Sequence, residues 1–194
     1  SFPPAWTVDA DGKPLLSWRV LLLPYLDHKP LYDKFRLDEP WDSSHNRQLL
    51  NRMPNTYRLH TRGNSSRTMT DYVAVVGEET LWPYTESRNY DSISDGSSHT
   101  LLVAEFVGHD IPWTKPEDLH FDQMDMTADS DDGICSVLSP PAFATADGVI
   151  RFLPVGTPEN IVRALLTAQG GETFDLDKLP KTRDGRLRAQ KPVR

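Results

Sequence analysis

Residues 139–171 read SPPAFATADGVIRFLPVGTPENIVRALLTAQGG and predict a β-hairpin followed by a helix. Residues 142–145 and 149–153 have the composition of two short strands. The Asp147-Gly148 pair between them readily adopts the φ > 0 geometry of a tight hairpin turn. The hairpin needs a sheet to join, so further strands are expected elsewhere in the chain.

The same stretch continues into the signals of a capped helix. Thr157 is a suitable cap, Pro158 suits the first helical position, and Glu159 favours the positive end of the helix dipole. Residues 170 and 171 are glycines, which accept the left-handed conformation that ends many helices. One face is apolar because four residues recur at helical spacing: Ile161, Val162, Leu165 and Leu166.

The remaining chain alternates between short helical and extended patterns. Helices are expected at 18–23 with Ser17 as its cap, at 25–35, and at 44–53, and strands at 56–59, 71–76 and 100–107. Residues 108–138 show no periodicity and are expected to form a long irregular segment. The fold class that follows is α+β, with N-terminal helices packed on an antiparallel sheet and a C-terminal hairpin and helix.

The overall composition is that of one globular domain. Hydrophobic residues make up 38% of the 194 residues and charged residues 25%, which suits a chain with a single core. The 16 prolines indicate many irregular loops. No apolar run approaches the roughly 20 residues needed to span a bilayer as a helix. We assign residues 1–175 to the domain.

Charge is distributed unevenly along the chain. Residues 178–194 hold seven basic residues and one acidic residue, whereas the other 177 residues hold 14 basic and 27 acidic ones. An acidic body disfavours nucleic acid, because contacts with phosphate dominate that affinity. We therefore expect no nucleic-acid partner, and we expect residues 176–194 to form a basic, disordered tail.

The sequence contains no catalytic signature. The six histidines form no paired metal-binding spacing, no glycine-rich phosphate loop is present, and no serine lies in a nucleophile elbow. Cys135 is the only cysteine, which excludes an internal disulfide, and we expect its thiol to be buried and inert. A non-enzymatic role is the favoured interpretation. A hydrolase remains a weak alternative, because sequence does not exclude a triad of distant residues.

One acidic cluster suggests a calcium site. Asp129, Asp131 and Asp132 lie within a stretch of five residues that ends in Gly133, and calcium prefers several oxygen ligands from such a loop. The cluster lacks the closing glutamate of an EF-hand, since the twelfth position is Pro140. A solvated turn is therefore favoured over calcium, which is the one cofactor considered.

Two further sets of residues invite an assignment. Glu105 lies within the apolar strand TLLVAEFV, where a carboxylate must be paired or point outward. Arg19 and Lys115 are possible partners, and a structural ion pair between Arg19 and Glu105 is our prediction. Trp82 and Trp113 lie in proline-containing loops and are candidates for an exposed sugar-stacking surface, although packing in the core is favoured.

A series of motifs in a fixed order resembles the large planctomycete family of unknown function whose members carry a type IV prepilin-like N-terminus, similar to that of G-type pseudopilins of type II secretion. The resemblance runs from SFPP at residues 1–4 to GGE at 170–172. Its motifs are DGKPLLSWRV (11–20), LLPYL (22–26), LDEPWDS (37–43), DYVAVVG (71–77), ISDG (93–96), PWTKPEDL (112–119) and ADGVIRFL (146–153).

The resemblance implies a pseudopilin-like globular head that is exported and works in the cell envelope or periplasm. In the family a long hydrophobic helix precedes the SFPP start; that helix is absent from this chain, so a membrane would be contacted only through it. The implied partners are other envelope or pseudopilus-like proteins, and no catalytic residues are carried over. Relatives commonly have a His-Pro-Gly-Gly sequence with its histidine ten residues before the turn aspartate, and here that position is Val137.

Two functions from different classes follow. The first is a non-enzymatic pseudopilin-like envelope protein that acts through protein–protein contacts. The alternative is an extracytoplasmic module that binds carbohydrate or another small ligand through the loops of Trp82 and Trp113. A flat apolar patch near the N-terminus would favour the first, and a concave aromatic cleft lined by residues 78–92 and 108–133 would favour the second.

Overall fold

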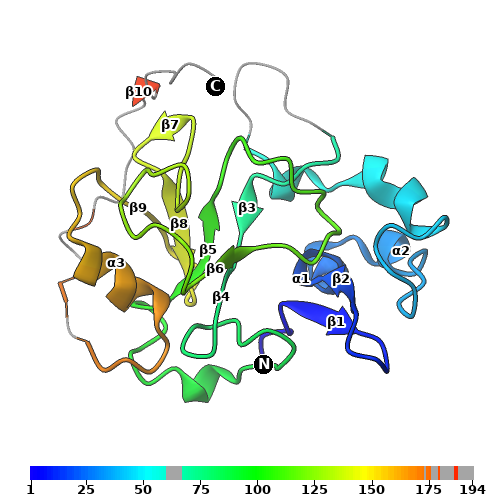
Figure 1. Cartoon of the computed structure of the whole chain (residues 1–194), viewed down its shortest axis with the longest axis horizontal. Helices are drawn as coiled ribbons and strands as arrows, with labels where there is room; N and C mark the ends of the chain where they lie inside the picture. Colours follow the sequence, from blue (N-terminus) through cyan, green and yellow to red (C-terminus); the bar gives the residue numbers. More distant parts are fainter. Residues whose placement is uncertain (60–66, 173, 176–178, 180–185, 188–194) are drawn as a thin grey trace.

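The computed structural model describes residues 1–59, 67–172, 174–175, 179 and 186–187, and these form a mixed structure of short helices and strands (Figure 1). The N-terminal part contains β1 (Trp6–Val8), β2 (Pro14–Ser17), α1 (Trp18–Leu21), η1 (Leu23–Leu26), α2 (Lys29–Tyr32), η2 (Asn46–Arg52) and η3 (Asn55–Tyr57), where η denotes a 3₁₀ helix. The remainder contains β3 (Tyr72–Val73), β4 (Val75–Val76), η4 (Tyr90–Ser92), β5 (Leu101–Glu105), β6 (Leu119–His120), β7 (Leu138–Ser139), β8 (Ala142–Thr145), β9 (Ile150–Phe152), α3 (Glu159–Leu166) and β10 (Arg186–Leu187).

The central sheet is antiparallel and has the order β3-β5-β8-β9. Its β8–β9 hairpin confirms the predicted one, and β8 has the predicted bounds. Gly148 adopts φ 83° in the turn, which only glycine accepts without strain. Asp147 stabilises the turn, because its Oδ1 accepts hydrogen bonds from Thr145 Oγ1 at 2.6 Å and from Val149 N at 3.2 Å.

The predicted strand at 71–76 is divided into β3 and β4 at Ala74. β3 pairs with β5 in antiparallel register, whereas β4 pairs with β6 in parallel register. The chain passes from one sheet to the other at Ala74, because the Ala74 N–H donates to Asp118 Oδ1 (2.8 Å) and the Ala74 carbonyl accepts from Leu119 N (3.2 Å). Two further antiparallel pairs are β1 with β2 and β7 with β10.

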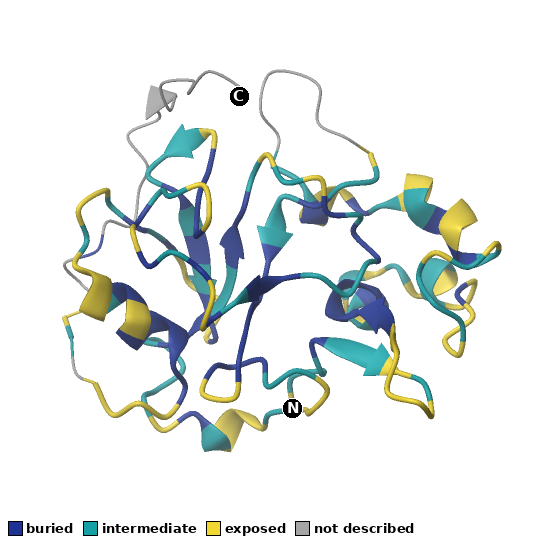
Figure 2. Ribbon diagram, in the orientation of Figure 1, coloured by how far each residue is buried: buried dark blue, intermediate teal, exposed yellow. Residues whose placement is uncertain are grey.

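The central sheet carries an apolar cluster on each side, and Figure 2 shows that its strands consist mainly of buried and intermediate residues. On one side the apolar face of α3, formed by Val162, Leu165 and Leu166, packs with sheet residues such as Leu101 and Phe143. On the other side the N-terminal helices bring together aromatic side chains that include Trp18, Phe35, Tyr57, Trp82 and Trp113. Complete burial of one large apolar side chain contributes about 1.5–3 kcal/mol.

The predicted N-terminal helices are present but shorter than expected. Ser17 caps α1 through a bond from Arg19 N (3.3 Å), as predicted, and the expected helix at 25–35 is broken into η1 and α2. The strand predicted at 56–59 is wrong, because residues 55–57 form η3. Tyr57 N donates to Pro54 O at 3.1 Å in this turn, which places the Tyr57 ring in the core.

The cap assigned to α3 is also wrong. Thr157 Oγ1 donates to the Pro154 carbonyl (2.7 Å), Pro158 occupies the cap position, and the helix ends at Leu166 rather than at the two glycines. Most of the predicted tail at 176–194 lies outside the described residues; within it, β10 pairs with β7. Within the described residues, none of the helices has the length and apolar character required to cross a membrane.

Candidate functional site

A buried ion pair joins α1 to the residue that precedes β6. Arg19 Nη2 lies 2.7 Å from Asp118 Oδ1, and both side chains are fully buried. The same carboxylate oxygen accepts bonds from Trp18 Nε1 (3.1 Å) and Ala74 N (2.8 Å). Burial raises the pKa of Asp118 above its ordinary value, although the Arg19 guanidinium acts in the opposite direction.

All three nitrogens of the Arg19 guanidinium donate hydrogen bonds to the groups around it. Its Nε and Nη2 donate to the Tyr72 carbonyl at 3.0 and 2.8 Å, and its Nη1 donates to Ser17 Oγ at 2.8 Å. The carbonyl of Arg19 accepts from Tyr57 Oη at 2.7 Å, and burial raises the pKa of that phenol well above its ordinary value. The ion pair with its ring of hydrogen bonds is therefore a structural clamp, as a buried charge requires.

The predicted partner of Arg19 is therefore corrected from Glu105 to Asp118. Glu105 is buried in β5, and its Oε2 accepts a bond from Ala142 N at 2.8 Å. Lys115, the other candidate, pairs with Glu117. The sheet register places Glu105 opposite Tyr72, whose carbonyl faces the guanidinium.

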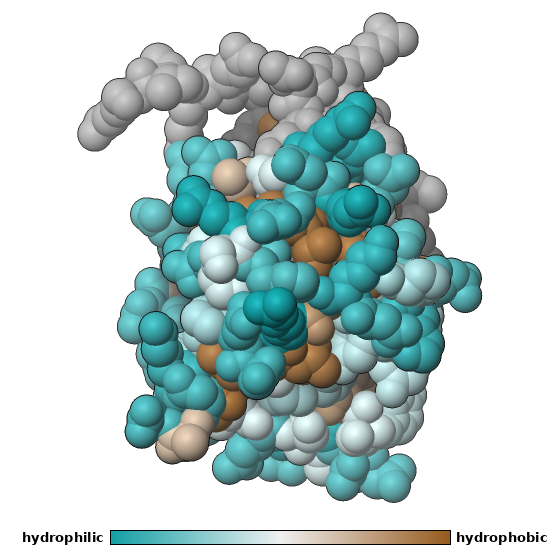
Figure 3. Space-filling view, turned by 90° about the vertical axis from the view of Figure 1, so that its right-hand side faces the viewer, coloured by the Kyte–Doolittle hydropathy of each residue, from teal (hydrophilic) through white to brown (hydrophobic). Residues whose placement is uncertain are grey.

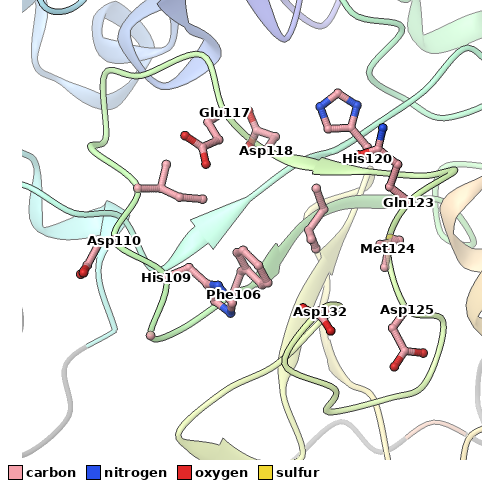
Figure 4. Close-up of a pocket in the computed structure, with 13 residues that line it drawn as sticks. Phe106, His109, Asp110, Glu117, Asp118, His120, Gln123, Met124, Asp125 and Asp132 are labelled. Atoms are coloured by element: carbon pink, nitrogen blue, oxygen red, sulfur yellow. The ribbon is translucent and has the colours of Figure 1, made fainter. Parts of the chain in front are cut away.

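A polar cavity of about 760 Å³ opens beside this clamp, between the segment that follows β5 and the loop that follows β6 (Figure 4). Figure 4 shows Glu117 and Asp118 on one side of it and Asp125 and Asp132 on the other. The lining residues include two histidines, His109 and His120, and neither lysine nor arginine. The lining is therefore acidic.

Phe106 and His109 form a stacked pair in the wall of this cavity. Their ring centroids are 3.6 Å apart and their planes differ by 6°. Burial lowers the pKa of His109, opposed by the nearby Asp131 and Asp132, so the ring favours its neutral form. Cys135 Sγ lies 3.8 Å from His109 Nε2, and its residue is 1% exposed, as expected for a buried thiol.

Besides the contact between Cys135 and His109, a second pair places a nucleophilic side chain next to a histidine: Ser98 and His99. Ser98 Oγ lies 3.0 Å from His99 Nδ1, and the His99 ring meets Phe174 edge-on. Neither Ser98 nor Cys135 lines the polar cavity. Sequence alone did not reveal the Cys135–His109 contact, because 26 residues separate the two.

Asp129 and Asp132 of the candidate calcium cluster, for which the sequence favours a solvated turn, have different surroundings. Asp129 adopts φ 64° and its Oδ1 accepts from Ser136 N (3.3 Å), whereas Asp132 lines the polar cavity. Within the described part of the chain, no group of three or more histidine, cysteine, aspartate or glutamate side chains is arranged to hold a metal ion. Asp125 stabilises this loop by accepting hydrogen bonds from Ser130 Oγ and Thr127 N. The bond from Ser130 also lowers the pKa of the Asp125 carboxyl.

The two candidate sugar-stacking tryptophans belong to the core, as the favoured interpretation predicted, and their rings are not exposed. Trp82 is 1% exposed and Trp113 is 0% exposed. Each indole N–H is satisfied by a carbonyl: Trp82 Nε1 donates to Leu102 O (2.7 Å) and Trp113 Nε1 to Leu50 O (3.0 Å). Trp113 also stacks on Tyr57, with ring centroids 5.9 Å apart.

An apolar groove of about 480 Å³ lies near the N-terminus and has no charged lining residue. One wall comes from the N-terminal part of the chain and includes Phe2, Trp18, Leu22 and Leu26; the other comes from β5, β8 and β9 and includes Leu102, Val103, Ala142, Ala144 and Ile150. Figure 3, which faces the end of the molecule that carries α2, shows apolar patches set in a hydrophilic surface. Ile150, at the rim, is 61% exposed.

Comparison with known proteins finds a family model that matches part of the chain. A family model described as "Protein of unknown function (DUF1559)" matches residues 1–61, and this supports the resemblance to a family of unknown function. No curated protein matches the chain significantly, and neither does any solved structure. The matched segment contains Arg19 and one wall of the apolar groove.

Proposed function

We propose that this protein is a non-enzymatic, pseudopilin-like component of the cell envelope that acts through protein–protein contacts at the apolar groove. The observation that carries the proposal is the groove itself, which lies beside the N-terminus and is lined without a single charged residue. Groups of apolar side chains left open to solvent in this way mark interaction sites.

The position of the groove fits an assembly role. Phe2 and Pro3 line it, so a helix joined ahead of Ser1, as in the family that the chain resembles, would leave the domain beside the groove. The other wall is a sheet face, and an apolar helix covers such a face well. An extracytoplasmic location in the envelope or periplasm, and partners among other envelope or pseudopilus-like proteins, follow from the same proposal.

A pair of matched substitutions tests the assembly role. Ile150 is 61% exposed at the groove, and Val155 is 67% exposed but does not line it. Ile150→Asp should abolish incorporation of the full-length protein into envelope complexes, measured by crosslinking in the native membrane, whereas Val155→Asp should leave it intact. Both positions are exposed, so the folding stability should change little. Equal incorporation of the two variants would refute the assembly role of the groove.

The alternative is an extracytoplasmic module that binds carbohydrate or another small ligand, and the polar cavity favours it. A volume of about 760 Å³ falls in the range of ligand sites, about 300–1,000 Å³, and the lining offers several hydrogen-bonding groups. The ligand would lie on the Phe106–His109 pair rather than on Trp82 and Trp113. Calorimetric titration with a panel of sugars, repeated with Asp132→Asn, distinguishes this function from assembly.

A further inference from the structure

A smaller hollow of about 250 Å³ gathers two arginines and two asparagines where η2 is followed by η3. Its lining residues are Asn51, Met53, Asn55, Arg58 and Arg67, none of which is acidic. This composition contrasts with the polar cavity, which is acidic, and with the net charge of −7 for the whole chain. The hollow is thus a local concentration of positive charge.

The Arg58 guanidinium has hydrogen-bond donors that are not used within the described structure. Its Nη2 donates to Asn55 Oδ1 at 2.7 Å, whereas its Nε is buried and has no hydrogen-bond partner in the described structure. A guanidinium carries five N–H donors, so most of its capacity remains available.

Among the described residues, no carboxylate forms an ion pair with either arginine. The ion pairs found among the described residues involve Arg19, Lys29, Arg36 and Lys115, but neither Arg58 nor Arg67. Asp71 is the acid whose charge Arg58 influences, and burial raises the pKa of that carboxyl. Its Oδ2 is engaged by Leu59 N at 2.7 Å.

We propose that this hollow binds a small oxyanion of the phosphate type, held by the guanidinium groups of Arg58 and Arg67 and by the side-chain amides of Asn51 and Asn55. The planar guanidinium fork matches the oxygen spacing of phosphate, and such charge-assisted bonds are about twice as strong as neutral ones. The volume is about eight times the share of one water in the liquid, about 30 Å³, so a phosphate group fits with part of its hydration shell. The hollow shares no lining residue with the apolar groove, and the proposal does not rest on the assembly role.

Titration of the full chain with inorganic phosphate tests this site. Isothermal calorimetry at constant ionic strength, with sodium chloride as the reference salt, should give saturable binding to one site. Arg58→Gln and Arg67→Gln should each weaken it at least about tenfold, since one hydrogen bond to a charged group contributes that much or more. Arg47→Gln, an exposed arginine of η2 outside the hollow, should bind like the parent.

Two outcomes would overturn the proposal: heats no larger than those of chloride, or an equal loss of affinity in Arg47→Gln. Because Arg58 bonds to Asn55 and its loss could disturb η3, Arg67→Gln, at an exposed position, provides the independent variant. Sedimentation with phosphatidylglycerol vesicles, against phosphatidylcholine vesicles, identifies the source of the phosphate group. Vesicle binding lost in Arg67→Gln assigns a lipid headgroup, and phosphate binding without vesicle binding assigns a soluble anion.

Discussion

Removal of the Arg19 guanidinium should destabilise the domain severely. In Arg19→Met the carboxylate of Asp118 stays buried but retains only the bonds from Trp18 Nε1 and Ala74 N. Breaking a buried ion pair on one side costs about 3–5 kcal/mol, because the remaining charge is left without compensation. A domain of ordinary stability, about 5–15 kcal/mol, would lose a large share of it.

The double variant decides whether the loss comes from the pair itself. Asp118→Leu leaves the Arg19 cation buried and should cost a similar amount, whereas Arg19→Met/Asp118→Leu removes both charges and should cost less than the sum of the singles. Urea denaturation at pH 7 gives the free energy of unfolding of each variant. The exposed pair Lys29–Asp33, with side chains 66% and 54% exposed, supplies the control Lys29→Met, which should cost about 1 kcal/mol or less. Additive costs for the two singles, or an Arg19→Met cost no larger than the control, would refute the clamp.

Two further predictions concern the wall of the polar cavity and the loop beside it. Burial lowers the pKa of His109 in the folded state, so the unfolded chain binds more protons and stability should fall as the pH drops through the ordinary histidine pKa of about 6.5. Urea denaturation of the parent and of His109→Gln at pH 7.5 and 5.5 should show a larger loss in the parent, and parallel losses would contradict this. For residues 129–132 we expect equal melting temperatures in excess calcium and in chelator, because no metal-binding group of three side chains forms within the described structure. A higher melting temperature in calcium would instead establish a calcium site. Calcium at 100 times its Kd would raise the free energy of unfolding by about 2.7 kcal/mol.

Local signals predicted the hairpin well and the broken N-terminal helices in outline. The turn needs a residue with positive φ beside an aspartate that bonds its own neighbours, and the Asp147-Gly148 pair meets both requirements within four residues of sequence. Ser17 was identified as a cap for the same reason, since its bond reaches only to Arg19. Such hydrogen bonds can be predicted from the sequence because both partners lie within a few residues of each other.

Interactions between distant segments were not predictable in this way. Arg19 and Asp118 are separated by 99 residues, and the sequence offers many carboxylates of equal merit. Glu105 is the partner of Arg19 that the sequence predicts, because it is a carboxylate in an apolar strand. In the structure Glu105 lies opposite Tyr72 in the β3–β5 register, and the Arg19 guanidinium bonds to the carbonyl of Tyr72. The division of residues 71–76 into two strands also depends on a distant residue, because the Ala74 N–H donates to Asp118 Oδ1.

The clamp and the groove are parts of one arrangement. Trp18 lines the groove and donates its indole N–H to Asp118, while Arg19, its neighbour, bonds to the carbonyl of Tyr72, which also lines the groove. The groove has one wall from the segment that matches the family model and one from the central sheet, and Arg19 links them because it donates to the Tyr72 carbonyl in β3 while it pairs with Asp118, the residue before β6. A buried ion pair adds little net stability compared with apolar residues of the same volume, so its value here lies in setting a single relative position of the walls. The assembly surface that we propose would require that fixed position, because it is built from two segments far apart in sequence.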